Sequence, residues 1–313
     1  MYEEPARKLR IAILAGGESA EREVSLASGG AVAPALAAAG HQMEIFDPAI
    51  DDLDLIAWSE FDVCFIALHG GPGEDGRVQR RLETRGVCYT GSDPAASHLA
   101  MSKSAAKERF VEQGVPTADF LLVDAPAENS RPFALAEMGW PLVVKPDRQG
   151  SSIGVGFAAT AAELCLRMDE ARQFDSRVLL ERWIDGREFT VAVLGRRPLP
   201  LIEIITPRAL FDYEAKYESA LTQYRFEHGL SETLTQQVTL TAVAATEALG
   251  TSGLVRVDVM VDRAGRPFVL EVNTVPGLTN HSLAPKAAAR AGLNMTDLCQ
   301  WMIQDALLAE VNS

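Results

Sequence analysis

The stretch that decides the fold is Arg256–Ser282, RVDVMVDRAGRPFVLEVNTVPGLTNHS, in which polar and apolar residues alternate. A period of two predicts a pair of β-strands, and the residues between them, DRAGRP, favour a turn. Because residues two apart on a strand share a face, Arg256 and Asp258 should point to the same side as Met260. The valines between them should point the other way, towards a core.

The second strand of this hairpin should carry Val269, Glu271 and Asn273 on one face, with Leu270 and Val272 on the opposite face. When the polar faces of the two strands align, they form one concave wall of charged and amide groups. A long polar loop follows this buried strand, and loops in such positions often bind ligands.

The polar wall of Arg256, Asp258, Glu271 and Asn273 has the ligand types that a hard divalent cation prefers. Two carboxylates and an amide oxygen, with no cysteine or histidine on either strand, suit Mg²⁺ or Mn²⁺. Phosphate oxygens and water would supply the other ligands, and Arg256 would neutralise a developing negative charge. The alternative is an ordinary hairpin with a solvated polar face. The apolar setting and the exit loop favour the metal and phosphate site.

The composition sets limits on the function. A chain of 313 residues predicts two or three domains, and a hydrophobic content of 47% supports a buried core. A net charge of −14 argues against a general nucleic-acid surface, so a nucleotide would be held by a few well-placed cations and a metal. The four cysteines form no CxxC pair and favour reduced core thiols. With no signal peptide pattern and no apolar run that could cross a bilayer, we expect a cytoplasmic protein without membrane contact.

The N-terminal part predicts a doubly wound α/β domain. Leu9–Ala15 is an apolar strand that ends in Gly16–Gly17, and an alanine-rich helix follows. The dinucleotide fingerprint is absent, and Glu18, Glu21 and Glu23 would repel a pyrophosphate at the start of this helix. A carboxylate there suits the amino group of a substrate. The alternative is that these acids only complement the helix dipole.

A second buried strand, Phe61–Leu68, leads into a glycine-rich loop that begins with His69. The carboxyl end of a strand in an α/β sheet is where such folds bind ligands, which makes His69 a candidate. A structural histidine with satisfied hydrogen bonds is an equal alternative. A short strand at 86–89 should close this first domain near residue 100.

The middle of the chain carries a phosphate-binding pattern. Lys103 lies on a predicted helix, and Lys145 lies in the apolar end of a strong strand, where a buried ammonium needs an anion. The loop 149–154, QGSSIG, has small residues whose backbone N–H groups can wrap phosphate oxygens. A plain hairpin turn is the alternative, and the loop is not a Walker A sequence. The weakly periodic segment 206–229 predicts a lid over an anionic ligand.

Six blocks of the sequence resemble the D-alanine–D-alanine ligase family of ATP-grasp enzymes. They recur in the family's order over nearly the whole chain, and small departures at 148–149 and 254–255 touch no assigned residue. The blocks are Gly16–Leu26, Ile66–Gly76, Val144–Gly154, Glu181–Phe189, Asp212–Tyr217 and Arg256–Ser282.

This resemblance implies an α/β N-terminal domain of the preATP-grasp type, followed by an α+β ATP-grasp fold of two subdomains. The expected boundaries are 1–101 for the N-terminal substrate domain, 102–190 for the central subdomain, and 191–313 for the C-terminal subdomain with the metal site and the 206–229 lid. The resemblance also implies a homodimer.

The resemblance implies ATP as co-substrate, two Mg²⁺ or Mn²⁺ ions and, as a further candidate, a monovalent cation such as K⁺. Two kinds of ligand to ATP are expected, those of its phosphates and those of its adenosine. The phosphate group comprises Lys103, Lys145, Lys216, Ser151 and Ser152. The adenosine group comprises Glu181 and Ile184 at the adenine and Glu188 at the ribose. The implied metal ligands are Asp258, Glu271 and Asn273.

The implied reaction is the ligation of two D-alanine molecules for peptidoglycan precursors, and so for cell-wall synthesis and cell shape. The first D-alanine carboxylate attacks the ATP γ-phosphate, and the amine of the second displaces phosphate from the acyl phosphate. Glu21 and His69 should lie at the first D-alanine, Arg256 and the Gly277 N–H at the oxyanion, and Ser282 with Leu283 at the second carboxylate. Glu21, Ser151 and Tyr217 resemble a linked trio of the family.

Three other functions compete with this one. A related ligase could use D-lactate, D-serine or another amine, although Tyr217 favours an amino acid as second substrate by resemblance. A non-catalytic nucleotide-binding regulator should have lost Asp258, Glu271 or Arg256, and all three are present. A dehydrogenase would need the glycine fingerprint that Gly16–Gly17 lacks.

Overall fold

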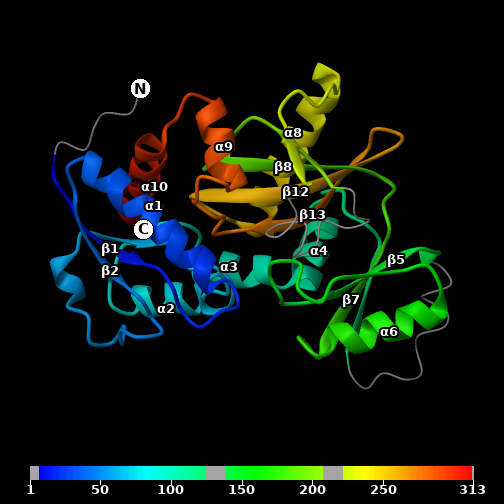
Figure 1. Ribbon diagram of the computed structural model, residues 1–313, viewed down its shortest axis with the longest axis horizontal. Helices are drawn as coiled ribbons and strands as arrows, with labels where there is room; N and C mark the ends of the chain where they lie inside the picture. The colour runs from blue at the N-terminus through cyan, green and yellow to red at the C-terminus, as the bar shows by residue number, and fades with distance from the viewer. Residues whose placement is uncertain (1–6, 125–137, 207–220, 312–313) are drawn as a thin grey trace.

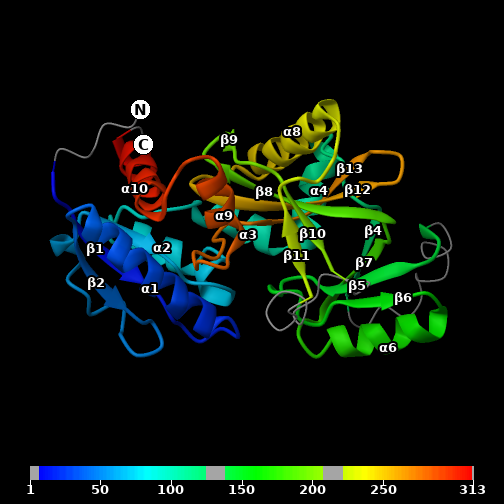
Figure 2. The same cartoon turned by 45° about the horizontal axis from the view of Figure 1, so that its top comes forward.

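The computed structural model of the chain describes residues 7–124, 138–206 and 221–311, and these form three β-sheets. One sheet and its helices lie at one end of the molecule, and the other two sheets lie one above the other at the opposite end (Figures 1 and 2). Among the helices of the described residues, none combines the length and apolar character needed to span a bilayer.

The N-terminal sheet is parallel, with β1 between β2 and β3. Ile11 and Ile13 pack under α1 and α10, while Ala12 and Leu14 on the opposite face pack near α2. Helices on both faces of a parallel sheet confirm the predicted doubly wound arrangement. The elements are β1 (Arg10–Leu14), α1 (Arg22–Ala38), β2 (Gln42–Phe46), η1 (Trp58–Glu60), β3 (Val63–Ile66), η2 (Gly71–Gly73), α2 (Arg77–Glu83) and α10 (Met295–Val311).

Two differences from the sequence predictions concern this domain. The predicted strand at 86–89 makes only an isolated bridge between Cys64 and Tyr89, so the sheet ends at β3. The cysteines are all free, as predicted, but Cys165 is exposed on a surface helix and is not a core thiol.

Two short helices, α3 (Pro94–Met101) and α4 (Lys103–Glu112), connect the first sheet to the rest of the chain. Asp93 and Ser102 cap them, each by accepting a backbone N–H of the first turn. The central sheet that follows has the antiparallel order β4-β7-β5-β6, and α6 covers one of its faces. Its elements are β4 (Phe120–Asp124), β5 (Leu142–Pro146), β6 (Gly156–Ala158), α6 (Ala161–Ala171) and β7 (Arg177–Arg182).

The C-terminal sheet has the order β11-β10-β8-β12-β13, with β9 paired to β8. The predicted hairpin of Arg256–Asn273 forms its β12 and β13, and Val255, Val257 and Val259 pack into the core beneath α8. Helices α9 and α10 contribute to the core on the opposite face. The elements are β8 (Gly186–Leu194), β9 (Arg197–Pro198), β10 (Ile202–Ile205), β11 (Gln223–Arg225), α8 (Glu232–Leu249), β12 (Leu254–Asp262), β13 (Pro267–Asn273) and α9 (Leu283–Arg290).

One prediction about this hairpin was wrong. Asp258 pairs with Glu271 but the next residue, Val259, pairs with Val269, so Leu270 is an extra residue in a β-bulge. The bulge reverses the alternation. Val269 is therefore buried in the core with Val272, while Leu270 turns towards the ligand side with Met260.

The change of sheet between β7 and β8 falls between Arg182 and Gly186, a few residues before the predicted boundary at 190. The boundaries at 101 and 190 stay predictions. Helix α4 belongs by packing to the C-terminal core, since Ala106 and Phe110 lie in the same cluster as the valines of β12.

Candidate functional site

Two adjoining cavities lie where the three parts of the chain meet. The larger, of about 470 Å³, is lined by the N-terminal domain, the 149–154 loop, the C-terminal sheet and the start of α9. The narrower one, of about 80 Å³, lies between the central and C-terminal sheets. Lys103 and Glu271 line both cavities, so the two form one continuous site.

The polar wall of the site comes from β12 and β13. Their register places Arg256 opposite Asn273 and Asp258 opposite Glu271. The Arg256 guanidinium donates from Nε and Nη2 to the two oxygens of Asp258, each at 3.1 Å, and Thr190 Oγ1 donates to Asp258 Oδ1 at 2.6 Å. Asp258 is buried, so these donors hold its carboxylate in one orientation.

The oxygen donors of this wall are few. Among the residues that the structure describes, no group of three or more His, Cys, Asp or Glu side chains is placed to hold a metal by itself. Asp258, Glu271 and Asn273 offer two carboxylates and one amide, a set that suits Mg²⁺ when phosphates and water complete the shell. The Asn273 Oδ1 atom accepts the Val275 N–H at 2.9 Å, which orients the amide.

A buried cluster of three lysines and one glutamate lies beside the narrower cavity, which is lined by Lys103, Lys145 and Glu181 of this cluster. Lys145 Nζ donates to Glu181 Oε2 at 2.6 Å, Lys107 Nζ lies 3.2 Å from Glu181 Oε1, and Lys103 Nζ donates to the Gln149 carbonyl at 2.6 Å. Burial alone would raise the pKa of Glu181, but Lys107 and Lys145 together hold it below its ordinary value.

The two lysines that line the site differ in their electrostatics. Burial lowers the pKa of Lys103, although the nearby Glu271 carboxylate opposes the shift. Burial also acts to lower the pKa of Lys145, but Glu181 outweighs it and the pKa is raised above the ordinary value. Lys145 is therefore the more firmly protonated of the two, and both suit contact with an anion.

The 149–154 loop has a strained backbone at its centre. Ser151 and Ser152 have φ angles of 52° and 54°, which residues with a side chain rarely adopt. Ser151 Oγ donates to Glu21 Oε1, so the loop is tied to the N-terminal domain. A Cβ atom at Gly150 would lie 3.0 Å from Glu21 Oε2 and one at Gly70 would lie 2.6 Å from it, so these glycines leave room for the carboxylate.

His69 lies at the carboxyl end of β3 and is almost fully buried. Its Nδ1 lies 2.9 Å from the Val275 carbonyl, and its Nε2 lies 2.8 Å from Ser28 Oγ. Ser28 Oγ also accepts the Leu278 N–H at 3.1 Å. An imidazole that donates from Nδ1 to Val275 and accepts from Ser28 at Nε2 fits both hydrogen bonds, and Glu74 Oε1 lies 3.7 Å from the same Nδ1 atom. This network of Ser28, His69 and Leu278 fastens the 275–278 loop to the N-terminal domain.

The far end of the larger cavity is formed by the start of α9. Ser282 is the N-cap residue, but its Oγ accepts from Thr279 N at 3.1 Å and makes no cap to its own helix. The first N–H groups of the helix thus remain available for an anion. The ring of Tyr224 on β11 lines the same end, with Lys286 Nζ 4.8 Å from its centre.

Comparison with known proteins identifies the origin of this arrangement. A family model described as the C-terminus of D-Ala-D-Ala ligase matches residues 110–304. The chain belongs to the D-alanine–D-alanine ligase family. A D-alanine–D-alanine ligase of Ectopseudomonas mendocina (strain ymp) is 45% identical over 300 residues, with 96% of this chain and 95% of the relative covered. One of Alkalilimnicola ehrlichii is 44% identical, with 97% and 96% covered.

Solved structures of D-alanine–D-alanine ligases are similar over the same length. That of Bacillus anthracis superposes with a TM-score of 0.88 at 34% identity, with 97% of this chain and 99% of that chain covered. A crystal structure of the same enzyme complexed with ATP gives 0.86 at 31% identity, with the same shares covered. The predicted ATP-grasp fold is thereby confirmed.

For this D-alanine–D-alanine ligase family member, the structure brings together every predicted site residue that it describes. Lys216 and Tyr217 lie outside the described residues, as does most of the 206–229 segment. The larger cavity is lined by Glu21, His69, Lys103, Ser151, Arg256, Glu271, Asn273, Gly277, Ser282 and Leu283. The narrower cavity is lined by Lys103, Lys145, Ser152, Glu181, Ile184, Glu188, Asp258 and Glu271.

Sequence reasoning missed four residues at this D-alanine–D-alanine ligase site. Lys107 could have been found, because it follows Lys103 by one helical turn and shares its face. Thr190 could have been found as the neighbour of Asp258 across β8 and β12. Ser28 and Tyr224 carry no local signal, because only the tertiary fold brings them to the site.

Proposed function

We propose that this protein joins two molecules of D-alanine in a reaction driven by ATP, with release of ADP and phosphate. The product, D-alanyl-D-alanine, is a peptidoglycan precursor. The observation that carries the proposal is the continuous cavity, in which buried lysines, an oxygen-rich wall and an anion-binding helix start face one space. Membership of the D-alanine–D-alanine ligase family supports the choice of substrate.

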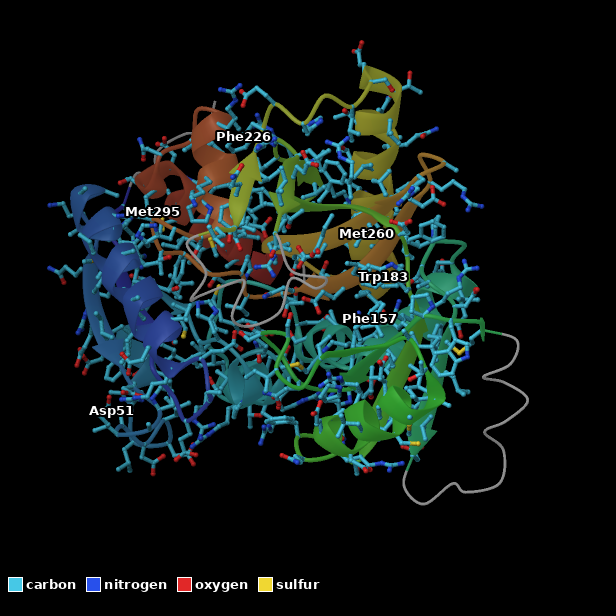
Figure 3. The ribbon with its side chains drawn as sticks, turned by 45° about the vertical axis from the view of Figure 1, so that its right-hand side comes forward. Asp51, Phe157, Trp183, Phe226, Met260 and Met295 are labelled. Atoms are coloured by element: carbon cyan, nitrogen blue, oxygen red, sulfur yellow. The ribbon has the colours of Figure 1, made fainter. Side chains whose placement is uncertain are left out.

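We place ATP in the narrower cavity, between the central and C-terminal sheets. Trp183 and Ile184 on one side and Met260 and Leu270 on the other offer apolar surfaces for the base, and Figure 3 shows Met260 on the sheet above Trp183. Glu181 would contact the adenine and Glu188 the ribose. The phosphates would meet Lys103, Lys145, Ser151 and Ser152, and Lys216 would join them from the 206–229 lid.

Asp258, Glu271 and Asn273 would hold two Mg²⁺ or Mn²⁺ ions against the phosphates. The fit rests on the donor set, because three oxygen groups face the lysine cluster across the cavity. When bound, these ions would neutralise charge on the transferring phosphoryl group. The expectation of a monovalent cation such as K⁺ stays a prediction without assigned ligands.

The first D-alanine would bind in the larger cavity, with its ammonium at Glu21 and His69 close by. Its carboxylate oxygen attacks the γ-phosphorus of ATP, the bond to the β-phosphate oxygen breaks, and an acyl phosphate and ADP result. The amine of the second D-alanine then attacks the carbonyl carbon, and phosphate leaves with the bonding electrons. The amine gives up a proton as the amide forms.

The chain's own groups would lower the barrier of the second step. Arg256 and the Gly277 N–H would stabilise the oxyanion of the tetrahedral intermediate. Ser282 and the Leu283 N–H would hold the second carboxylate at the start of α9. The link of Glu21 to Ser151, which Tyr217 would extend, would keep the lid closed and exclude water from the acyl phosphate.

The experiment that tests this proposal is phosphate release from ATP and Mg²⁺ with single acceptors. We expect turnover with D-alanine and formation of D-alanyl-D-alanine. The alternative ligases predict turnover with D-lactate, D-serine or another amine instead, and absence of turnover with D-alanine would reject our choice. We further propose that the protein is cytoplasmic and that it forms a homodimer. Analytical ultracentrifugation of the purified protein would test the dimer.

A further inference from the structure

One aromatic side chain at the end of the larger cavity has no part in the reaction described so far. Tyr224 on β11 pairs across the sheet with Ile204, which pairs in turn with Glu188 of the narrower cavity. Residues directly opposite each other on neighbouring strands share a face, so Tyr224 lies on the ligand face of the C-terminal sheet. Its side chain lines the larger cavity together with Arg256 and Ser282.

Two cation–π pairs join β11 and the residue after it to α9. Lys286 Nζ lies 4.8 Å from the centre of the Tyr224 ring, and the Arg290 guanidinium lies 5.5 Å from the centre of the Phe226 ring. The rings are two residues apart on an extended chain and the cations are four apart on a helix, so each set shares one face. The Tyr224 ring lines the larger cavity, whereas Phe226, labelled beside α9 in Figure 3, packs against the core next to that helix.

The pair with Lys286 places the Tyr224 ring beside the start of α9. Lys286 follows Ser282 by four residues, and side chains on a helix lean towards its N-terminus, so the ammonium lies towards the helix start. The phenol also lies near the charges of the sheet. Burial raises the pKa of Tyr224, the Arg256 guanidinium opposes this rise and the Glu188 carboxylate adds to it. The side chain of Tyr224 therefore extends from the start of α9 towards Arg256.

This position lies between the two groups that would hold the second substrate. In the proposed reaction, Arg256 lies at the carbonyl that the second amine attacks, and Ser282 with Leu283 holds the second carboxylate. An α-amino acid has one carbon between its amine and its carboxylate, so its side chain leaves the molecule between these two anchors. An aromatic wall beside that space limits how long the side chain can be.

We propose that Tyr224 restricts the second substrate to a D-amino acid with a one-carbon side chain, and that Lys286 is a positioning residue for its ring. The ring leaves room for the methyl group of D-alanine and excludes a propyl group. The first D-alanine, with its ammonium at Glu21, is not limited by this ring. This inference rests on the proposed ligation of two D-alanine molecules.

The test supplies ATP, D-alanine and D-norvaline, whose side chain is two carbons longer, to the wild type and to Tyr224→Ala. Mass spectrometry with fragmentation identifies the dipeptides and the order of their residues. We expect the wild type to prefer D-alanine at the second position by about 100-fold in kcat/KM, and Tyr224→Ala should lower this preference by at least about tenfold. D-norvaline should enter the C-terminal position of the product alone, and the KM for ATP should change less than about twofold.

Two variants of the rings serve as controls. Phe226→Ala removes the neighbouring ring and its cation–π pair, and it should keep the wild-type preference. Tyr224→Phe keeps the ring and should keep the preference as well, since the wall and not the hydroxyl excludes the longer side chain. Tyr224→Leu replaces Tyr224→Ala if that variant does not fold. A folded Tyr224→Ala or Tyr224→Leu with the wild-type preference, or D-norvaline at the first position, would overturn the inference.

Variants of the cations test the positioning role. Lys286→Met should lower the preference for D-alanine by about threefold, whereas Lys286→Arg keeps a cation over the ring and should retain the preference. Arg290→Met removes the matching cation over Phe226 and should leave the preference unchanged. Equal preferences in Lys286→Met and Arg290→Met would show that Lys286 does not position the ring.

The wild-type reaction separates this inference from the proposed function. If the wild type forms no D-alanyl-D-alanine, the ligase proposal fails and the inference fails with it. If the wild type forms that product while Tyr224→Ala selects its second substrate as the wild type does, the inference alone fails.

Discussion

The two ends of the continuous cavity are built by different means. The nucleotide end is formed by strands and α4, and buried charges stabilise it, because Lys107 and Lys145 each form an ion pair with Glu181. The substrate end is assembled from loops and helix starts, through single hydrogen bonds such as those of Ser28 and His69. The first end is preformed by two neighbouring sheets, whereas the second exists only when distant parts of the chain meet.

This difference indicates which interactions make each end of the cavity rigid. Buried charges on strands give a rigid recognition surface, because both the strand pairing and the Coulomb attraction resist displacement. Loops joined by single hydrogen bonds give a surface that depends on each bond. Substitutions should therefore act locally at the nucleotide end and more widely at the substrate end.

The largest effect is expected where the two ends meet, at Glu271. Glu271→Gln keeps the shape of the side chain and removes its charge, so we expect kcat to fall by about a thousandfold or more through lost metal binding. The melting temperature should stay within about 3 °C of the wild type, since the residue lies on the cavity wall. Phosphate release and thermal denaturation measure the two quantities.

The matched control for that variant is Glu247→Gln, a loss of the same charge on an exposed helix position. It should leave kcat unchanged. Full activity in Glu271→Gln would contradict the metal assignment. It would also show that this residue, which lines both cavities, has no role in the reaction.

A smaller effect is expected at Gly70, which tests how tightly the substrate end is packed. Gly70→Ala places a Cβ atom 2.6 Å from Glu21 Oε2 at a φ of +67°, so the carboxylate must move and its link to Ser151 should break. We expect the KM for D-alanine to rise by about 30-fold while the KM for ATP changes little. Initial-rate kinetics with each substrate varied in turn measure both.

Gly86→Ala is a close control for Gly70→Ala. Gly86 has a φ of +63° and no heavy atom near its added Cβ, so it shares the positive φ with Gly70 but lacks the contact. Equal changes in KM for the two variants would show that strain alone is responsible and that Glu21 is not involved.

Ser28→Ala should reduce activity by less than Gly70→Ala does. It leaves the Leu278 N–H and His69 Nε2 without their buried partner, so the 275–278 loop should lose its register beside Gly277. We expect kcat to fall by about tenfold, and the protein to lose about 1–3 kcal/mol of stability. Urea denaturation and phosphate release give the two values.

Ser25→Ala sharpens this prediction. Ser25 is as buried as Ser28 on the same helix, but it bonds Gly16 N and the Ala67 carbonyl, away from the loop. A similar loss of stability without loss of kcat is expected. If both variants lose kcat equally, the network of Ser28 and His69 has no positioning role.

The smallest effect on activity is expected at Asp47, where only stability should change. The Arg22 guanidinium, opposed by burial, lowers the pKa of Asp47 to about 2. A depressed folded pKa means that the stabilisation is fully present above the unfolded pKa of about 4 and is lost as the pH falls through about 2. Asp47→Asn should therefore cost about 1–2 kcal/mol at pH 7, after solvent screening, and less towards pH 2.

Denaturation of Asp47→Asn and the wild type at a series of pH values measures this difference. The gap between the two proteins should narrow on acidification, and phosphate release at pH 7 should stay at the wild-type level. A gap that is constant with pH would place the stabilisation outside the ion pair.

Most of the C-terminal hairpin was predictable from sequence, because a period of two fixes which side chains share a face. The bulge was not predictable, since nothing in PFVLEVN shows which residue is the extra one. Because of the bulge, the prediction assigned Val269 and Leu270 to the wrong faces. Glu271 and Asn273 lie on the expected face, because both lie beyond the irregularity.

Contacts between residues far apart in the sequence were also not predictable. The glycine loop and Glu21 were both identified as candidates, yet their mutual contact came only with the resemblance and then the structure. Ser28 lies in an alanine-rich helix with no local mark, and its partner Leu278 is 250 positions away. Roles that depend on Lys216 and Tyr217 stay predictions, since these residues lie outside the described ranges.

The bond between Ser28 and Leu278 also has a consequence for biosynthesis. A ribosome delivers Ser28 of α1 250 residues before Leu278, so the nascent chain holds one side of its substrate pocket well before the other side exists. Helix α10, which covers the Ile11 and Ile13 face of the first sheet, emerges later still. Until α10 has been synthesised, this face is covered by α1 alone, so the core of the N-terminal domain is completed only after the C-terminal sheet has been made.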